Sequence, residues 1–345
     1  MIYVVIVFLW TSILLYILLG GADFGAGIIE LFTSRANQPK TRKTMYKAIG
    51  PIWEANHMWL IIAIVILFVG FPVIYATVSI YLHIPLVCML LGIIARGTAF
   101  VFRNYDAVKD DMQKVYTPIF MYSSLITPLF LGIIAGSAVS GKIDPDAGDF
   151  LSAYIFSWLN WFSVATGVFT VAICGFLASI FIIGQTDTED SRRHFTRKAR
   201  ECVFIVMFAG ALVFLAAYAE DVPLINWIFG DIPGLVAIIA ASLSLVVMFY
   251  AFKQERPILL RILAGFQVTM ILFAATYSHF PDIVLTRNGN NLSLLAHAGQ
   301  SGSIRALGLA LLIGSVFILP ALVYLIYIFQ VRKGGMEESP DRKHF

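Results

Sequence analysis

The chain has 345 residues, of which 59% are apolar and only 13% are charged, and its mean hydropathy is +0.84. This composition lies far outside that of soluble domains and predicts an integral membrane protein. The formal net charge of +3 does not indicate a nucleic-acid partner, because the basic residues stand in short gaps between apolar runs and form no continuous patch. Cys88, Cys174 and Cys202 lack CxxC spacing, so they indicate neither a zinc site nor a disulfide framework.

Apolar runs long enough to span a membrane recur along the whole chain. They predict nine spans, at residues 2–32, 51–71, 76–103, 116–139, 151–184, 201–219, 233–252, 257–280 and 303–331. Residues 1–34 contain no Lys or Arg, so the first span lacks the basic region of a signal peptide and is expected to be retained.

These spans predict an all-α, polytopic fold in a single membrane domain. We expect the domain to cover residues 1–331 and a cytoplasmic tail to follow at 332–345. Nine helices can be grouped as four, four and one, so we expect two four-helix bundles, at 2–139 and 151–280, with a peripheral ninth helix at 303–331.

The distribution of basic residues predicts the orientation in the membrane. With the N-terminus outside, 21 of the 24 Lys and Arg residues fall on or near the inner side. Only Lys142, Arg287 and Arg305 fall on the outer side, where acidic residues such as those in IDPDAGD at 143–149 predominate. The positive-inside rule therefore predicts an N-out, C-in topology.

The first span contains an acidic residue in LLGGADFGAGIIELF, residues 18–32. The glycines around Asp23 indicate a helix-packing face, because small residues let helices approach closely in lipid. An acid near a helix centre costs roughly 2.5–3.5 kcal/mol on insertion scales and is usually kept for function. Asp23 should lie about 14 Å from the inner membrane end of its helix.

The second and third spans carry further ionisable residues near the same end. Glu54 and His57, in GPIWEANHMWL at 50–60, should lie about 5 and 9 Å from that end, and Arg96, in LLGIIARGTAFVFR, about 10 Å. Chain connectivity places the three helices together, so we expect Asp23, Glu54, His57 and Arg96 to converge in the cytoplasmic third of the membrane. Such a constellation is typical of a proton or ion path.

Simpler structural roles remain open for these residues. Asp23 and Arg96 could form a static ion pair, since Arg has no accessible deprotonated form. Glu54 could be a first-turn acid stabilised by the helix dipole after Pro51. Glu54 and His57 are the better relay candidates, because both can titrate near neutral pH when their surroundings shift them.

No haem or metal site is indicated by the remaining histidines. His83 should lie about 20 Å from His57 in depth, so the two cannot ligate one haem. No phosphate-binding glycine loop or nucleophile triad is found either.

Three segments taken together resemble the hallmark segments of subunit II of the cytochrome bd quinol oxidases. They are GGADFGAG, GPIWEANHMWL with the FP that follows, and RGTAFVFR. The resemblance covers the whole chain in length and topology, while the specific motifs lie in roughly the first 105 residues. Some relatives have Asp at the position of Glu54, and Gly97 replaces the proline of the family string RPxxFxxR, in which Arg96, Phe100 and Arg103 match.

The resemblance implies a complex in the prokaryotic cytoplasmic membrane that oxidises ubiquinol or menaquinol and reduces O2 to water. It implies that haem b, haem d and the quinol-oxidising loop belong to subunit I, the partner, and that this chain holds no cofactor or metal of its own. It also implies that membrane lipid surrounds the complex and that a small single-helix accessory subunit can accompany it. Protons are implied to enter from the cytoplasm through a channel between the subunits that involves the acid after the motif tryptophan, here Glu54.

We therefore interpret Glu54 as the proton relay, with His57 and Asn56 as auxiliary relay residues. Structural or proton-entry roles are expected for Asp23, Arg96, Arg103, Trp53 and Trp59. The rival hypothesis is a secondary transporter whose coupling-ion site contains Asp23 and Glu54, although transporter sites favour the midplane and both halves of the chain. A third hypothesis is that the chain is a purely structural scaffold for subunit I.

Overall fold

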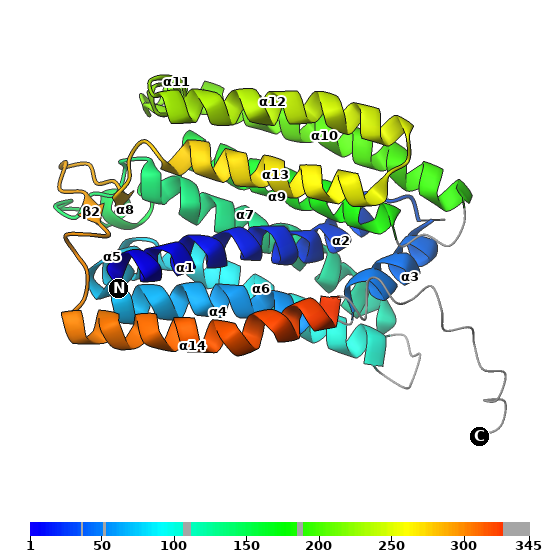
Figure 1. Cartoon of the computed structure of the whole chain (residues 1–345), viewed down its shortest axis with the longest axis horizontal. Helices are drawn as coiled ribbons and strands as arrows, with labels where there is room; N and C mark the ends of the chain where they lie inside the picture. The colour runs from blue at the N-terminus through cyan, green and yellow to red at the C-terminus, as the bar shows by residue number, and fades with distance from the viewer. Residues whose placement is uncertain (36, 51–52, 106–111, 185–188, 327–345) are drawn as a thin grey trace.

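The computed structural model describes residues 1–35, 37–50, 53–105, 112–184 and 189–326 (Figure 1). The first half of the chain forms α1 (Ile2–Leu15), the π-helical turn η1 (Tyr16–Gly20), α2 (Gly21–Leu31), α3 (Gln38–Ile49), α4 (Trp53–Gly70), α5 (Pro72–Tyr81), α6 (His83–Tyr105) and α7 (Gln113–Val139). The second half forms α8 (Phe150–Tyr154), α9 (Trp161–Ile183), α10 (Glu189–Ala219), α11 (Leu224–Phe229), α12 (Ile232–Lys253), α13 (Pro257–Thr276), the strands β1 (Asp282–Val284) and β2 (Leu292–Ser293), and α14 (Ser301–Ile326).

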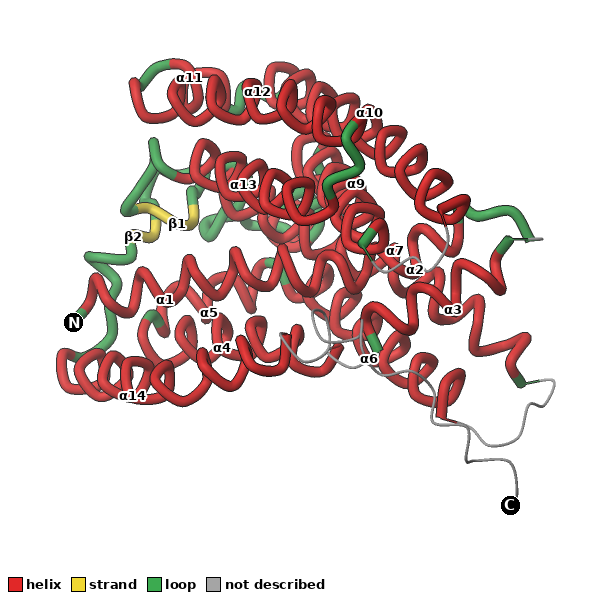
Figure 2. The backbone as a smooth tube through the Cα atoms, turned by 45° about the vertical axis from the view of Figure 1, so that its right-hand side comes forward, coloured by secondary structure: helices red, strands yellow, loops and turns green. Residues whose placement is uncertain are grey.

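Nine helices within these ranges are long and apolar enough to cross a membrane, which confirms the predicted all-α membrane fold. The first of them, Ile2–Leu31, joins α1, η1 and α2 into one rod. Figure 2 shows the long helices running side by side along one direction, with the single small hairpin of β1 and β2 at one end. The predicted tail at 332–345 lies outside the described residues.

Two predicted spans were too long at their N-terminal ends. The span at 76–103 is interrupted at Leu82, whose φ of −110° and ψ of 23° are not helical, so α5 and α6 are separate helices. The span at 151–184 is divided into α8 and α9. The side chain of Asn160 accepts a hydrogen bond from the Ser163 amide and so begins α9 ten residues later than predicted.

Short or charged helices were missed because they are not apolar throughout. The predicted span at 201–219 begins in the structure at Glu189, and Phe195 and Ala199 cover the core from this charged extension. The helix α3 lies in a predicted loop, and α8 is capped by Asp149. The Ser152 amide donates to the Asp149 carboxylate, and this hydrogen bond lowers the pKa of that exposed carboxyl below its usual value.

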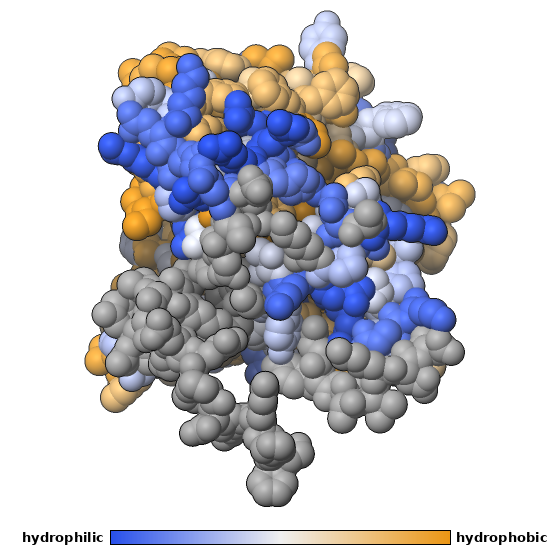
Figure 3. Space-filling model, turned by 90° about the vertical axis from the view of Figure 1, so that its right-hand side faces the viewer, coloured by the Kyte–Doolittle hydropathy of each residue, from blue (hydrophilic) through white to orange (hydrophobic). Residues whose placement is uncertain are grey.

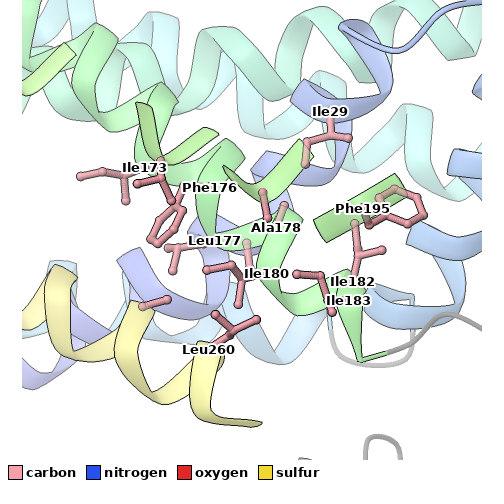
Figure 4. Close-up of a cluster of buried hydrophobic side chains, with 14 of the residues drawn as sticks. Ile29, Ile173, Phe176, Leu177, Ala178, Ile180, Ile182, Ile183, Phe195 and Leu260 are labelled. Carbon is pink, nitrogen blue, oxygen red and sulfur yellow. The ribbon is translucent and has the colours of Figure 1, made fainter. Parts of the chain in front are cut away.

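The helix α9 forms the centre of the packing. It contacts α2, α7, α10 and α13, and 61% of the residues in an 18-residue apolar stretch of this helix are buried. Figure 4 shows side chains of its second half, from Ile173 to Ile183, packed with Ile29 of α2, Phe195 of α10 and Leu260 of α13. Helices from both halves of the chain therefore share this core.

The helix α14 is peripheral. It packs against α1 and α4 at the edge of the molecule (Figure 1). Only 6% of the residues in an 18-residue apolar stretch of this helix are buried. The predicted division into two bundles of four helices stays a prediction, since α9 packs against helices of both groups.

One end of the helix array is rich in basic residues. Figure 3 shows this end as a largely hydrophilic face bordered by apolar flanks. We call it the basic end; its described Lys and Arg residues include Arg35, Arg42, Lys43, Lys114, Arg192, Arg193, Arg197, Lys198, Arg200, Lys253 and Arg256. The predicted cytoplasmic location of this end stays a prediction.

Candidate functional site

The helix α2 carries the buried acids of the site. All its residues from Gly21 to Glu30 are buried, because glycines on its surface let two neighbouring helices come close. A Cβ at Gly25 would collide with the backbone carbonyl of Cys174 in α9, and one at Gly27 with the side chain of Ser124 in α7. The predicted packing role of these glycines follows directly from these contacts.

Asp23 and Arg96 form a fully buried ion pair. The side chain of Asp23 is 0% exposed and that of Arg96 is 2% exposed. Arg96 Nη1 donates to Asp23 Oδ2 at 3.0 Å, and Nη2 lies 3.0 Å from Oδ1 and donates to the Asp23 carbonyl at 2.9 Å. Arg96 Nε donates to Ser124 Oγ at 3.1 Å, so the guanidinium is held on both edges.

His57 completes this cluster from α4. Its Nε2 lies 3.4 Å from Asp23 Oδ2 and 3.5 Å from Arg96 Nη1. Its side chain is 17% exposed, so it connects the buried ion pair with the surface of the chain. The rings of Tyr16, Phe24 and Trp53 surround the imidazole, with centroids 6.0, 5.5 and 6.3 Å away, and form a largely apolar wall. The predicted convergence of Asp23, His57 and Arg96 is thus found.

A second buried cluster lies two helical turns nearer the basic end. Glu30, which is fully buried, accepts from Arg103 Nη1 at 3.0 and 3.2 Å and from Arg42 Nε at 3.1 Å. Arg42 comes from α3 and also donates to Thr117 Oγ1 at 2.7 Å. The cluster therefore ties α3 to the membrane spans and gives Arg103 a partner.

Glu30 was not predicted from the sequence because it stands at the end of its span, where the free-energy cost of an acidic side chain is small. A usable signal was present, however. Asp23 and Glu30 are seven residues apart, and so are Arg96 and Arg103, which places both pairs on matching faces of two helices. The ring of Phe120 separates the two clusters, with the guanidinium carbons of Arg96 and Arg103 at 5.1 and 4.0 Å from its centroid.

Glu54 is not part of either cluster. It lies on the outer face of α4 and is exposed, whereas Asn56 and Trp59 lie on the buried face of the same helix. The expectation that Glu54 converges with Asp23, His57 and Arg96 is therefore wrong for this chain taken alone, because His57 turns inward and Glu54 outward. Trp53, half-buried between them, packs against Phe100 with ring centroids 5.0 Å apart.

Metal-ligand side chains do not gather into a cluster within the described residues. No group of three or more His, Cys, Asp or Glu side chains in them could hold a metal. The imidazole of His57 is engaged with Asp23, and both ring nitrogens of His279 contact backbone carbonyls, at 2.7 and 3.0 Å. We therefore derive no chemical step through a cofactor in this chain.

Comparison with known proteins gives a consistent result. Residues 1–329 match the family model described as cytochrome bd terminal oxidase subunit II. The chain is 28% identical over 329 residues to cytochrome bd ubiquinol oxidase subunit 2 of Bacillus subtilis, covering 93% of this chain and 94% of that protein. A putative cytochrome bd menaquinol oxidase subunit II of the same organism is 21% identical over 338 residues, with 93% of each chain covered.

A solved structure shares the fold. The bd oxidase from Geobacillus thermodenitrificans contains a chain that matches 95% of this chain over 98% of its own length, with a TM-score of 0.74 and 19% sequence identity. At that identity the match supports the helix arrangement, while the family model supports membership.

Proposed function

Because the chain belongs to the subunit II family of cytochrome bd terminal oxidases, we propose that it provides a proton-uptake path from the basic end towards the oxygen-reducing site of the complex. The family is a component of quinol:O2 oxidoreductase complexes, and this member is a multi-pass protein of a prokaryotic membrane. In this proposal Glu54 accepts the proton, and the oxygen chemistry takes place in subunit I, which holds the haems.

The observation that carries the proposal is the position of Glu54 at the end of an outward-facing apolar stripe of α4. The other members of this stripe are Met58, Ile61, Val65 and Phe68, each between 40% and 60% exposed. Their spacing alternates between three and four residues, which is the spacing of helices that pack along a seam. A stripe with this spacing suits packing against another helix, so a protein partner over it is proposed, with Glu54 at the end of the contact nearest the basic end.

Subunit I is the partner that we propose for this face. The neighbouring helix α14 is almost entirely unburied, so α4 and α14 together offer a broad apolar surface. Covered by the partner, Glu54 would lie in the boundary between two subunits, near the basic end. A proton path between the subunits then begins at this carboxylate.

His57 is the next titratable group along the proposed path. It stands one helical turn deeper than Glu54 and contacts both members of the Asp23–Arg96 pair. An imidazole can accept a proton on one ring nitrogen and release one from the other, and Asp23 Oδ2 lies within reach of His57 Nε2.

The other predicted residues have supporting roles in this proposal. Asn56 can both donate and accept hydrogen bonds, so it can extend a hydrogen-bond chain beside Glu54. Trp53 and Trp59 exclude water from the path, and Asp23 with Arg96 fixes the electrostatic environment of His57. Proton uptake from one side during electron transfer would build a membrane potential without a separate pump.

The geometry does not favour the transporter hypothesis. A coupling-ion site at Asp23 and Glu54 needs both carboxylates to face one cavity. Asp23 is instead fully buried and occupied by Arg96, while Glu54 points to the outside.

The test is Glu54→Gln in the two-subunit complex, with quinol-driven O2 uptake as the readout. Removal of a proton-transfer group should lower turnover by at least about tenfold, with Glu54→Asp retaining most of it. Glu201→Gln, an exposed acid near the same end in α10, is the matched control. Undiminished turnover and unchanged membrane potential in Glu54→Gln proteoliposomes would contradict the proposal.

The relay role of His57 is tested by His57→Gln, which keeps a polar side chain but cannot carry a proton. We expect slower O2 uptake with an intact haem spectrum. His83→Gln is the control, since His83 is exposed at the other end of the array and contacts the Ile80 carbonyl. Equal turnover in both variants would remove His57 from the path.

A further inference from the structure

A narrow groove of about 370 Å³ lies between α2, α7, α9 and α10. Its walls are apolar over most of its length, with Leu125 of α7, Val171 of α9 and Ile205 of α10 among them. Neither α4 nor α14 lines it, so it is separate from the face proposed for subunit I.

The groove has the length and direction of one leaflet of the bilayer. On α10 its lining runs from Lys198 to Leu212, which are fourteen residues or about 21 Å apart. Half of a hydrocarbon core is about 15 Å thick, and the interface adds several ångströms. The groove therefore extends from the basic end to about the middle of the membrane.

The groove is long for its volume, about 370 Å³ spread over about 21 Å. The small residues Ala172, Gly175 and Ala209 keep the groove open. A single hydrocarbon chain fits these dimensions.

A cationic side chain stands at the mouth of this groove. Lys198 Nζ donates to Thr33 Oγ1 at 2.6 Å, which is an uncharged acceptor. Among the described residues that line the groove, Glu201 is the only acid; it lies one turn further along α10 and is exposed. Arg197 and Arg200 are also exposed beside it, so the mouth is positive overall. Basic sites between spans at a cytoplasmic face attract phosphate headgroups.

We propose that this groove binds one acyl chain of a glycerophospholipid, with the lipid's phosphate diester against the Lys198 ammonium. The apolar length accepts the acyl chain and the ammonium recognises the phosphate, which is the part shared by anionic and zwitterionic phospholipids. The lipid would fill a gap between α7 and α10 and thereby join the two halves of the chain.

The test is native mass spectrometry of the purified two-subunit complex, delipidated and then titrated with phosphatidylglycerol or phosphatidylethanolamine. Gly175→Leu should abolish one binding event, because a Cβ at Gly175 meets only Ile28 Cγ2, at 3.7 Å, and the longer side chain can fill the groove without a backbone collision. Gly265→Leu is the matched control, since a Cβ there meets nothing within 4 Å and Gly265 lies outside the groove.

Lys198→Gln tests the headgroup contact independently of the groove. Loss of one cation near a phosphate should weaken binding about fivefold for both lipids. Arg193→Gln, an exposed cation at the same end, should leave the affinity unchanged. The proposal is overturned if Gly175→Leu binds as many lipids as the wild type, or if Lys198→Gln binds both lipids as tightly as Arg193→Gln does.

Discussion

Residues 1–139 and residues 161–276 each supply four membrane spans, but the two regions bury charge differently. The first region encloses Asp23, Glu30, Arg96 and Arg103 between α2, α6 and α7. In the second, α9 has no charged residue at all, α12 has only its terminal Lys253, and α13 has only Arg261. Helices of similar length and hydropathy can therefore pack in this chain without internal charge.

This difference indicates that the charges of the first region are not required for stability. A buried ion pair rarely stabilises a fold more than well-packed apolar side chains would, because removing both charges from water is expensive. The pairs Asp23–Arg96 and Glu30–Arg103 do fix a register, since both join residues that are 73 positions apart in the sequence. They also provide the polar interior in which His57 lies. A role in function and in fixing the helix register therefore explains these two ion pairs better than a contribution to stability does.

The largest effect is expected from Asp23→Asn. This change leaves the Arg96 guanidinium buried without a counter-charge, which costs about 3–5 kcal/mol in comparable sites. The purified complex should melt at a markedly lower temperature or fail to assemble. The double variant Asp23→Asn with Arg96→Met removes both charges and should recover most of the loss. If the double variant is as unstable as the single one, the ion pair has a stabilising role beyond charge neutralisation.

The Glu30 cluster allows a graded comparison of its two arginines. Arg103 has a side chain only 3% exposed, whereas that of Arg42 is 31% exposed and is screened by solvent. Arg103→Gln should therefore destabilise the complex by about 3 kcal/mol or more, and Arg42→Gln by no more than about 1 kcal/mol. Thermal unfolding of both variants, with Glu30→Gln as the common reference, measures the two couplings. Equal losses would mean that α3 is held as firmly as the membrane spans.

Hydropathy predicted the spans because each must present about 20 apolar residues to lipid, whatever it packs against. It could not predict α3 or the charged start of α10, where only one face of the helix is apolar. Ends of spans also depended on local hydrogen bonds, such as the cap at Asn160, which no window average detects. Side-chain contacts therefore determine where those helices begin.

The site was predictable where residues lie at similar depth on neighbouring helices, as Asp23, His57 and Arg96 do. The direction of Glu54 was not predictable. Its rotation about α4 depends on which residues of that helix, here Asn56 and Trp59, face the other helices of this chain. Glu30 was missed because depth alone suggested an exposed helix end, although its seven-residue spacing from Asp23 matched that of the two arginines.

A smaller effect than that of Arg103→Gln is expected at Arg261, the one charge within α13. Its Nη2 donates to the Phe181 carbonyl at 2.7 Å, and its guanidinium carbon lies 5.3 Å from the Phe181 ring centroid. Phe181 is in the last turn of α9, where backbone carbonyls lack helical partners, so Arg261 caps that helix from outside. Arg261→Met keeps the apolar contact and removes the hydrogen bond, which should cost about 1–2 kcal/mol. Oxygen uptake should stay normal, because no relay residue is touched.

Arg193→Met is the control for Arg261→Met. The pair of Arg193 and Glu189 is a surface ion pair one turn apart, with side chains 68% and 64% exposed, and should contribute no more than about 0.5 kcal/mol. A loss of oxygen uptake in Arg261→Met with unchanged melting temperature would place a functional charge in the second region. The contrast between the two regions would then no longer separate relay from scaffold.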